Sequence, residues 1–253
     1  MSEGSYIPPV PPPPVLPPPP PPPGGPSSSV TTPSGFDFGK PFTFVFEDPN
    51  WMGKILIGGL FYIAAFFIIG IFFILGYCAQ LTRNVVAGMP RPLPDWDKLG
   101  DYFGEGLRLF GALLLYALPM LILAGLFVVP ALIVENQNFT NDTGREILGT
   151  AAGCVWCLMV PLAIGMTLWL PAAGLRVVMT GRFGAAFEFG AIWALIKNNI
   201  GNYLLAVVVG IIARFLGGFG VILFCIGVVF TGFWAFLVQT HALAQVWKLA
   251  DRP

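Results

Sequence analysis

The chain has 253 residues, of which 56% are hydrophobic and only 10% are charged, and its formal net charge at pH 7 is zero. A soluble domain carries about a quarter charged residues, so this chain cannot cover a globular surface with polar groups and must expose part of its surface to lipid. The zero net charge offers no basic patch for a nucleic acid, and no nucleic-acid partner is expected. The composition predicts an all-α integral membrane protein whose first partner is the lipid bilayer.

The first part of the chain differs in composition from the rest. Its first 35 residues hold fifteen of the twenty-five prolines. Proline has a fixed φ and no N–H, so this segment cannot form a helix or a sheet and should sample extended polyproline II. We therefore divide the chain into a disordered proline-rich tail, residues 1–40, and a membrane helical domain, residues 41–253. The tail is either a semi-rigid spacer or a strand that docks into an aromatic groove of a protein partner.

The remainder of the chain predicts a polytopic helical bundle with about five spans. Runs of about 20 apolar residues are typical of helices that cross a membrane. The run from 200 to 247 is too long for one crossing of a bilayer about 30 Å thick, and Gly217 and Gly218 are the natural place to divide it. The predicted spans are 55–81, 109–134, 147–175, 200–216 and 221–246.

Two shorter stretches predict amphipathic helices at the membrane interface. In the first, Pro94 and Asp95 form a helix start, and an apolar stripe follows at helical spacing, with most of the charges off it. The stripe consists of Trp96, Leu99, Phe103 and Leu107. The second stretch follows Arg176, where charged residues interrupt an apolar sequence too often for a span.

The turns before these two stretches are similar in sequence. Arg83 to Gly88 is R-N-V-V-A-G, and Arg176 to Gly181 is R-V-V-M-T-G. Each follows a span and precedes an interfacial stretch and another span. Two copies with the same orientation would be a parallel internal repeat, although shared composition at a membrane edge would give the same similarity.

The same region resembles a known family. An apolar span ends in Gly-Tyr, followed by a basic turn, Leu-Pro-x-Trp-Asp and Gly-Leu; the matching residues are Gly76, Tyr77, Arg83, Gly88, Leu93, Pro94, Trp96, Asp97, Gly106 and Leu107. This pattern resembles the domain-of-unknown-function 4013 family over about residues 40–250. The resemblance implies a multi-pass protein of a bacterial or archaeal cell membrane, with no known activity. The proline-rich tail is not part of the family pattern.

No constellation of residues predicts catalysis or cofactor binding. Cys154 and Cys157 lie in an apolar span without a nearby histidine or carboxylate, so they are interpreted as buried small side chains rather than as half a metal site. His241 is the single histidine, which excludes a catalytic triad or a multi-histidine metal site within one chain. We therefore expect the protein to have no enzymatic activity and to bind no cofactor and no metal. The candidate functional or structural polar residues are Trp96, Asp97, Arg83, Arg176, Arg214 and His241.

Three functions fit the sequence. The favoured one is a scaffold or accessory subunit of a membrane complex; the alternatives are a small-molecule transporter or channel and an intramembrane enzyme. A carrier would place Arg214 or His241 in a polar cavity at mid-membrane depth, whereas a scaffold leaves both near a membrane edge. The positive-inside rule makes the turns near Arg83 and Arg176 cytoplasmic. Five spans then put the tail outside the cell, and a re-entrant hairpin in place of the first span would put it inside.

Overall fold

The computed structural model describes residues 35–136, 142–222 and 227–251, and within these ranges the chain is helical with no strand. The α-helices are α1 (Lys40–Thr43), α2 (Trp51–Ala64), α3 (Ile69–Val86), α4 (Leu99–Asn136), α5 (Asp142–Thr180), α6 (Phe189–Asn198), α7 (Ile200–Gly218) and α8 (Gly227–Ala250). Short 3-10 helices are η1 (Phe44–Glu47), η2 (Ala65–Phe67), η3 (Phe183–Phe187) and η4 (Phe219–Ile222). The all-α fold class is confirmed. Residues 1–34, most of the predicted tail, lie outside the described residues.

Five helical segments are long and apolar enough to cross a membrane, as a multi-pass membrane protein requires. They are Ile69–Val86, Leu99–Gly125, Gly153–Thr180, Ile200–Ile222 and Gly227–Ala250. The number agrees with the sequence prediction, and α7 ends at Gly218, where the long apolar run was divided.

The first predicted span, 55–81, is not one helix. The backbone bends at Ile68, which has a φ of 69°, an unusual conformation for a β-branched residue. Helix α2 ends before the bend and α3 begins after it, so the segment forms a helical hairpin. Before α2, the chain also turns by 109° between Lys40–Glu47 and Trp51–Phe67. The polar residues 48–50, which include Pro49, mark the first change of direction in the sequence, whereas apolar residues continue through the bend at Ile68. A re-entrant hairpin was the alternative to a single span at this place.

The first predicted interfacial helix is also not a separate element. It forms the beginning of α4, which continues without a break from Leu99 through the second predicted span. Of the predicted stripe, Trp96 packs on Tyr77 inside the protein, whereas Leu99, Phe103 and Leu107 are exposed. The buried face of this part of α4 carries Tyr102 and Leu109 instead. The second predicted interfacial stretch does form a short separate helix, α6.

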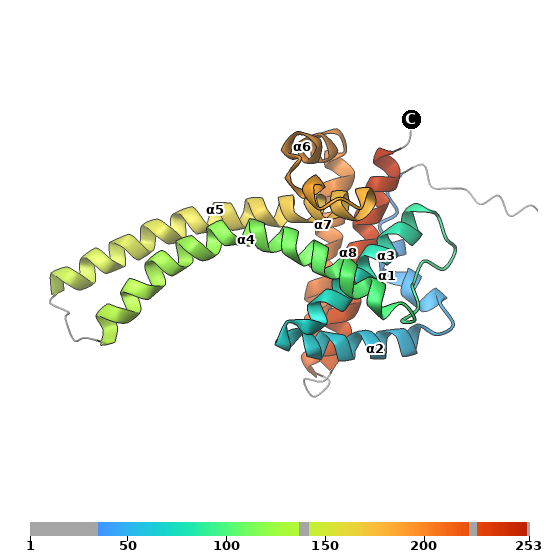
Figure 1. Cartoon of the computed structure of the whole chain (residues 1–253), viewed down its shortest axis with the longest axis horizontal. Helices are drawn as coiled ribbons and strands as arrows, with labels where there is room; N and C mark the ends of the chain where they lie inside the picture. Colours follow the sequence, from blue (N-terminus) through green and yellow to red (C-terminus); the bar gives the residue numbers. More distant parts are fainter. Residues whose placement is uncertain (1–34, 137–141, 223–226, 252–253) are drawn as a thin grey trace, which may run out of the picture. The chain divides into compact units, whose positions relative to one another are not determined.

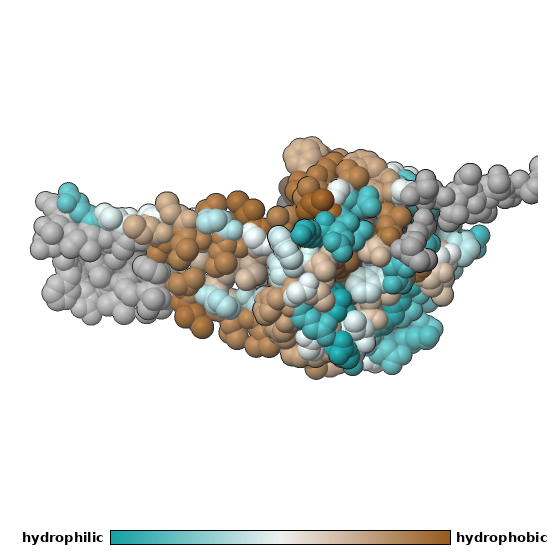
Figure 2. Space-filling model, turned by 90° about the horizontal axis from the view of Figure 1, so that it is seen from above, coloured by the Kyte–Doolittle hydropathy of each residue, from teal (hydrophilic) through white to brown (hydrophobic). Residues whose placement is uncertain are grey.

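Three pairs of helices form hairpins: α2 with α3, α4 with α5, and α7 with α8 (Figure 1). The distal parts of α4 and α5 run side by side away from the other helices (Figure 1). We call Leu114–Gly125 and Gly153–Thr167 the arm. Its described surface is largely apolar (Figure 2), with Leu118, Ile122 and Trp156 among its exposed side chains.

The similarity between the two basic turns extends to their conformation but not to the helices that follow. Gly88 and Gly181 both have a left-handed φ, 74° and 67°. Their neighbours then pack differently: α4 packs along α3, whereas α7 packs mainly on α8. The turn is shared by the two halves of the predicted repeat, and the helix packing around it is not.

Candidate functional site

The family-like segment before α4 is a buried loop whose backbone carbonyls are held by side chains from three helices. Pro92, Leu93 and Pro94 are buried, and prolines cannot donate a backbone hydrogen bond. Four consecutive carbonyls each accept one side-chain hydrogen bond: Asn84 Nδ2 to Pro92 O (2.8 Å), Lys54 Nζ to Leu93 O (3.0 Å), Tyr77 Oη to Pro94 O (2.8 Å) and Tyr102 Oη to Asp95 O (2.6 Å). A buried carbonyl without a partner is costly, so these donors fix the path of the loop. We call residues 92–95 and their four donors the clamp.

Lys54 is the ionic centre of the clamp. Its Nζ lies 2.7 Å from Asp48 Oδ2 and 2.9 Å from Asp95 Oδ1, and the side chains of Lys54 and Asp48 are almost fully buried. Two carboxylates and one carbonyl surround the ammonium group, which compensates for much of the hydration lost on burial. Lys54 thus joins the segment before α2 to the loop before α4.

Trp96 packs against two residues of the clamp, Tyr77 and Lys54. Its ring stacks on Tyr77 with centroids 4.2 Å apart and on Phe61 at 4.9 Å. Its Nε1 donates to Lys54 O at 3.0 Å. Asp97, the next family-like residue, is exposed in the turn before α4. Trp96 is therefore a structural residue, and Asp97 lies on the surface.

Arg83 and Arg176 occupy equivalent positions and make equivalent ion pairs. Arg83 forms a two-pronged pair with Glu105 of α4 and donates to Val178 O of α5 at 3.1 Å. Arg176 pairs with Glu188, which also accepts a bond from Arg182 at 2.8 Å. Each arginine ties the end of one helix to the element after its turn.

The Arg176 pair changes the acidity of its partner. The hydrogen bond from Arg176 holds the pKa of the Glu188 carboxyl below its usual value, and the nearby charge of Arg182 acts in the same direction. Glu188 precedes α6 and so lies outside the candidate spans.

His241 and Arg214 lie apart from each other and make different contacts. His241 is buried in α8, stacks on Phe44 of η1 at 4.3 Å, and has Nδ1 3.3 Å from Gln245 Nε2. Arg214 is exposed on α7, one turn before Gly218, and donates to Gln239 Oε1 at 2.6 Å.

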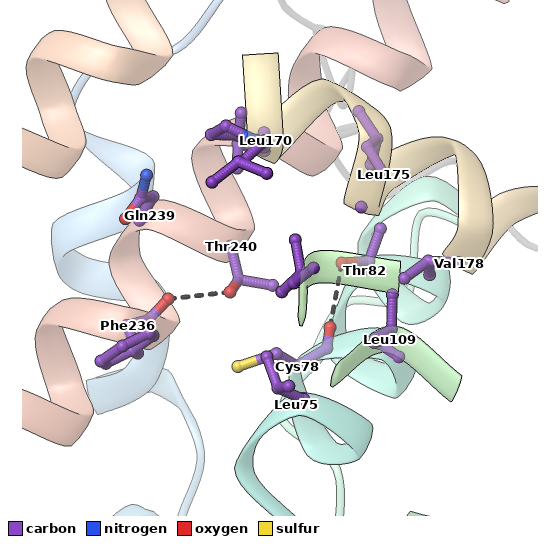
Figure 3. A pocket seen from close by; sticks show the side chains of 15 residues that line it. Leu75, Cys78, Thr82, Leu109, Leu170, Leu175, Val178, Phe236, Gln239 and Thr240 are labelled. Carbon is purple, nitrogen blue, oxygen red and sulfur yellow. Dashed lines mark hydrogen bonds between the residues drawn. The ribbon is translucent and has the colours of Figure 1, made fainter. Parts of the chain in front are cut away.

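A largely apolar cavity of about 270 Å³ lies between α3, α4, α5 and α8 (Figure 3). Leu75, Leu109, Leu175 and Leu243 are among its lining residues. Its hydroxyls, on Thr82 and Thr240, donate to the carbonyls of Cys78 and Phe236 in their own helices, as the dashed lines in Figure 3 mark. Because these hydroxyls are engaged, the lining suits an apolar occupant better than a hydrated solute.

Sequence reasoning found some members of the clamp and missed others. Tyr77, Leu93 and Pro94 belong to the family-like pattern, as does Trp96 beside the clamp. Lys54 and Tyr102 belong to no pattern in the sequence, and Asn84 lies in the first basic turn without being singled out by it. The signal that was present is the spacing of Pro92 and Pro94, since a proline-rich loop leaves carbonyls that need donors from elsewhere.

Comparison with known proteins places the chain in a family. No curated protein and no solved structure matches it. Residues 54–242 match the family described as "Protein of unknown function (DUF4013)", and this range contains the loop of the clamp, all four of its donors and both basic turns. Because the match covers most of the sequence, the chain belongs to the DUF4013 family.

Proposed function

We propose that this protein is a non-enzymatic scaffold or accessory subunit of a complex in a bacterial or archaeal cell membrane. The observation that carries the proposal is the clamp. The polar side chains around the family-like segment bind the protein's own backbone, since Asn84, Lys54, Tyr77 and Tyr102 each donate to one carbonyl of residues 92–95. Groups engaged in this way hold a fold and are not directed at a substrate.

The two ionisable residues that a carrier would need also favour a scaffold. His241 packs between Phe44 and Gln245, and it is not among the residues that line the apolar cavity. Arg214 is exposed on α7, and its guanidinium donates to Gln239 Oε1 of α8. A proton- or ion-coupled carrier would instead direct such groups into a water-filled path.

Partner binding would use two parts of the chain. The apolar arm offers a helical surface to other membrane helices, for which packing rather than hydrophobicity drives association. The proline-rich tail offers a strand of low conformational entropy to a soluble domain with an aromatic groove.

In-cell crosslinking followed by affinity isolation tests the proposal. The full chain, a chain lacking residues 1–34, and a chain with those residues replaced by a Gly/Ser sequence of equal length would be compared by mass spectrometry. We expect a specific partner with the full chain and its loss from both variants. Recovery of no partner with the full chain, or loss of solute flux in proteoliposomes caused by His241→Ala in normally folded protein, would overturn the scaffold function.

A further inference from the structure

The two ends of the described chain meet at the C-terminal end of α8. The Asp37 N–H donates to Gln245 Oε1 at 2.9 Å, and Gln245 Nε2 donates back to Asp37 O at 3.1 Å. The first basic turn lies at the same end, since a Cβ placed on Gly88 would be 3.2 Å from Lys248 Nζ. Residues 36–39, which the sequence assigned to the tail, are thus fastened beside the C-terminus.

The second basic turn belongs to the same end of the molecule. Arg108 donates to Gly181 O at 3.2 Å, and Arg83, five residues before Gly88, donates to Val178 O. A hollow of about 230 Å³ is lined by residues from α5, α6 and the end of α8, among them Arg176, Asn198, Trp247 and Asp251. We call this end, with the chain ends and both turns, the polar face.

The tips of two hairpins are apolar, in contrast to the polar face. At the α2–α3 bend, Ile63, Phe66 and Ile68 are exposed, and Phe66 is 86% exposed. At the end of α7, Phe215, Phe219 and Ile222 are exposed, and Ile222 is 77% exposed. The sequence from 215 to 230 contains no charged, amide or hydroxyl side chain. Arg214 directly precedes this run, and its guanidinium donates to Gln239 Oε1, a side chain that lies against Gly210, one turn farther from the tip. Tips that reached water would carry polar groups, so hydrocarbon is their matching environment.

The backbone at the α2–α3 bend is compatible with hydrocarbon. Ile68 N donates to Ala65 O at 2.9 Å, and Ile71 N donates to Ile68 O at 3.1 Å, so the turn keeps its hydrogen bonds within the segment. Helix α2 has 14 residues, fewer than the roughly 20 that one crossing needs. The lengths of α7 and α8 would let each helix cross the bilayer. The apolar sequence that joins them is the evidence that they do not cross it.

We propose that the α2–α3 and α7–α8 hairpins enter the membrane from the polar face and return to it, and that only the α4–α5 hairpin crosses. The sequence around the connection of α4 to α5, ENQNFTNDTGRE (residues 135–146), is polar, as a segment on the far side requires. The polar face carries a cluster of cations, and the positive-inside rule makes it cytoplasmic. Those cations are Arg83, Lys98, Arg108, Arg176, Arg182 and Lys248.

This topology adds detail to the proposed function. The partner assigned below depends on that function being correct. The tail joins the domain at the polar face, so it starts in the cytoplasm and not outside the cell. The partner that it meets there is a soluble protein domain with an aromatic groove for polyproline II. The soluble partner and the chain's own C-terminus share one surface.

Accessibility of single cysteines in intact cells tests the topology. In a background without Cys78, Cys154, Cys157 and Cys225, cysteine would replace Gly35, Asp251, Asn141, Phe67 or Ile222, one at a time. A membrane-impermeant maleimide should label position 141 in intact cells, and positions 35 and 251 only after permeabilisation. Positions 67 and 222 should react in neither preparation but should react with a lipid-soluble maleimide.

Three results would overturn the proposal. Labelling of positions 35 and 251 from opposite sides of the membrane would show that the chain ends do not share one face. Labelling of both in intact cells would show that this face lies outside the cell. Labelling of 67 or 222 by the impermeant reagent puts a tip in water. Phe66→Cys and Val221→Cys serve as second variants where the first ones fold poorly. Because labelling requires no partner, its outcome is independent of the capture experiment.

Discussion

At the scale of single residues, the buried polar groups of this protein hold its own chain together. Lys54 and the Lys40–Glu47 pair show how much context matters. Lys54 is buried between two carboxylates, whereas the side chains of Lys40 and Glu47 are 43% and 41% exposed. Removing one partner of a buried ion pair strongly destabilises a protein, whereas an exposed pair contributes little to stability.

Replacing Lys54 with Met should therefore destabilise the protein strongly. The change leaves Asp48 and Leu93 O without their cation in a buried site, which costs about 3–5 kcal/mol. Lys40→Met is the matched control and should cost less than about 1 kcal/mol. Melting temperatures of both variants in detergent check the prediction, and similar shifts would contradict it.

The Glu188 pair predicts a specific pH dependence. The pKa of Glu188 is lowered in the folded protein, so its contribution to stability is full above its ordinary pKa and is lost as the pH falls through the folded value. Acidification from pH 6 to 4 should lower the melting temperature of the wild type more than that of Glu188→Gln. Parallel curves for the two proteins would show that the pair does not contribute.

How far the sequence predicts such residues depends on the kind of signal they leave. Arg83 and Arg176 were identified because the turn around each is repeated, and the two make matching ion pairs. Lys54 was not identified as a candidate residue because its partners Asp48 and Asp95 are 6 and 41 positions away, with no local pattern that joins them. Long-range pairing of this kind cannot be derived from spacing along one chain.

At the scale of elements, glycines decide how closely α3 and α4 approach. A Cβ on Gly106 would lie 1.7 Å from Phe72 O, and one on Gly76 would lie 1.9 Å from Tyr102 O. Backbone atoms cannot move aside as a flexible side chain can, so the two helices depend on these positions.

Gly106→Ala should separate α3 from α4 and lower stability by about 1–3 kcal/mol or more. Gly104→Ala, two residues away, meets nothing within 4 Å and should stabilise the helix by up to about 1 kcal/mol. Thermal unfolding of both variants in detergent measures the difference. If both changes act in the same direction, the close helix contact is not a determinant of stability.

Composition and the positions of glycines predicted the helices better than the connections between them. The number of long apolar helices followed from hydrophobic runs, and the end of α7 followed from Gly217 and Gly218. The bend at Ile68 had no such marker, since the residues on both sides are apolar. The start of α4 was predicted as a separate helix because its charges differ from the apolar run that follows, yet one continuous helix can carry both compositions.

At the scale of the whole described domain, charge and apolar surface are segregated. Apolar side chains cover the arm (Figure 2), and polar contacts such as Asp37 with Gln245 and Arg108 with Gly181 lie at the chain ends and the basic turns. The sequence indicates a membrane protein through its average composition. The position of the polar end depends on contacts between distant parts of the chain. Asp37 and Gln245, for example, are 208 positions apart.

The central claim is that the polar residues of the clamp maintain the fold while partner binding lies elsewhere. The most direct test measures the partner captured per folded molecule for Tyr102→Phe and for the chain lacking residues 1–34. Tyr102→Phe removes the bond to Asp95 O and should reduce the amount of folded protein, with capture per folded molecule unchanged. The truncated chain should fold in normal amounts and capture less. Normal folding of Tyr102→Phe with lost capture, together with unimpaired capture by the truncated chain, would contradict the claim.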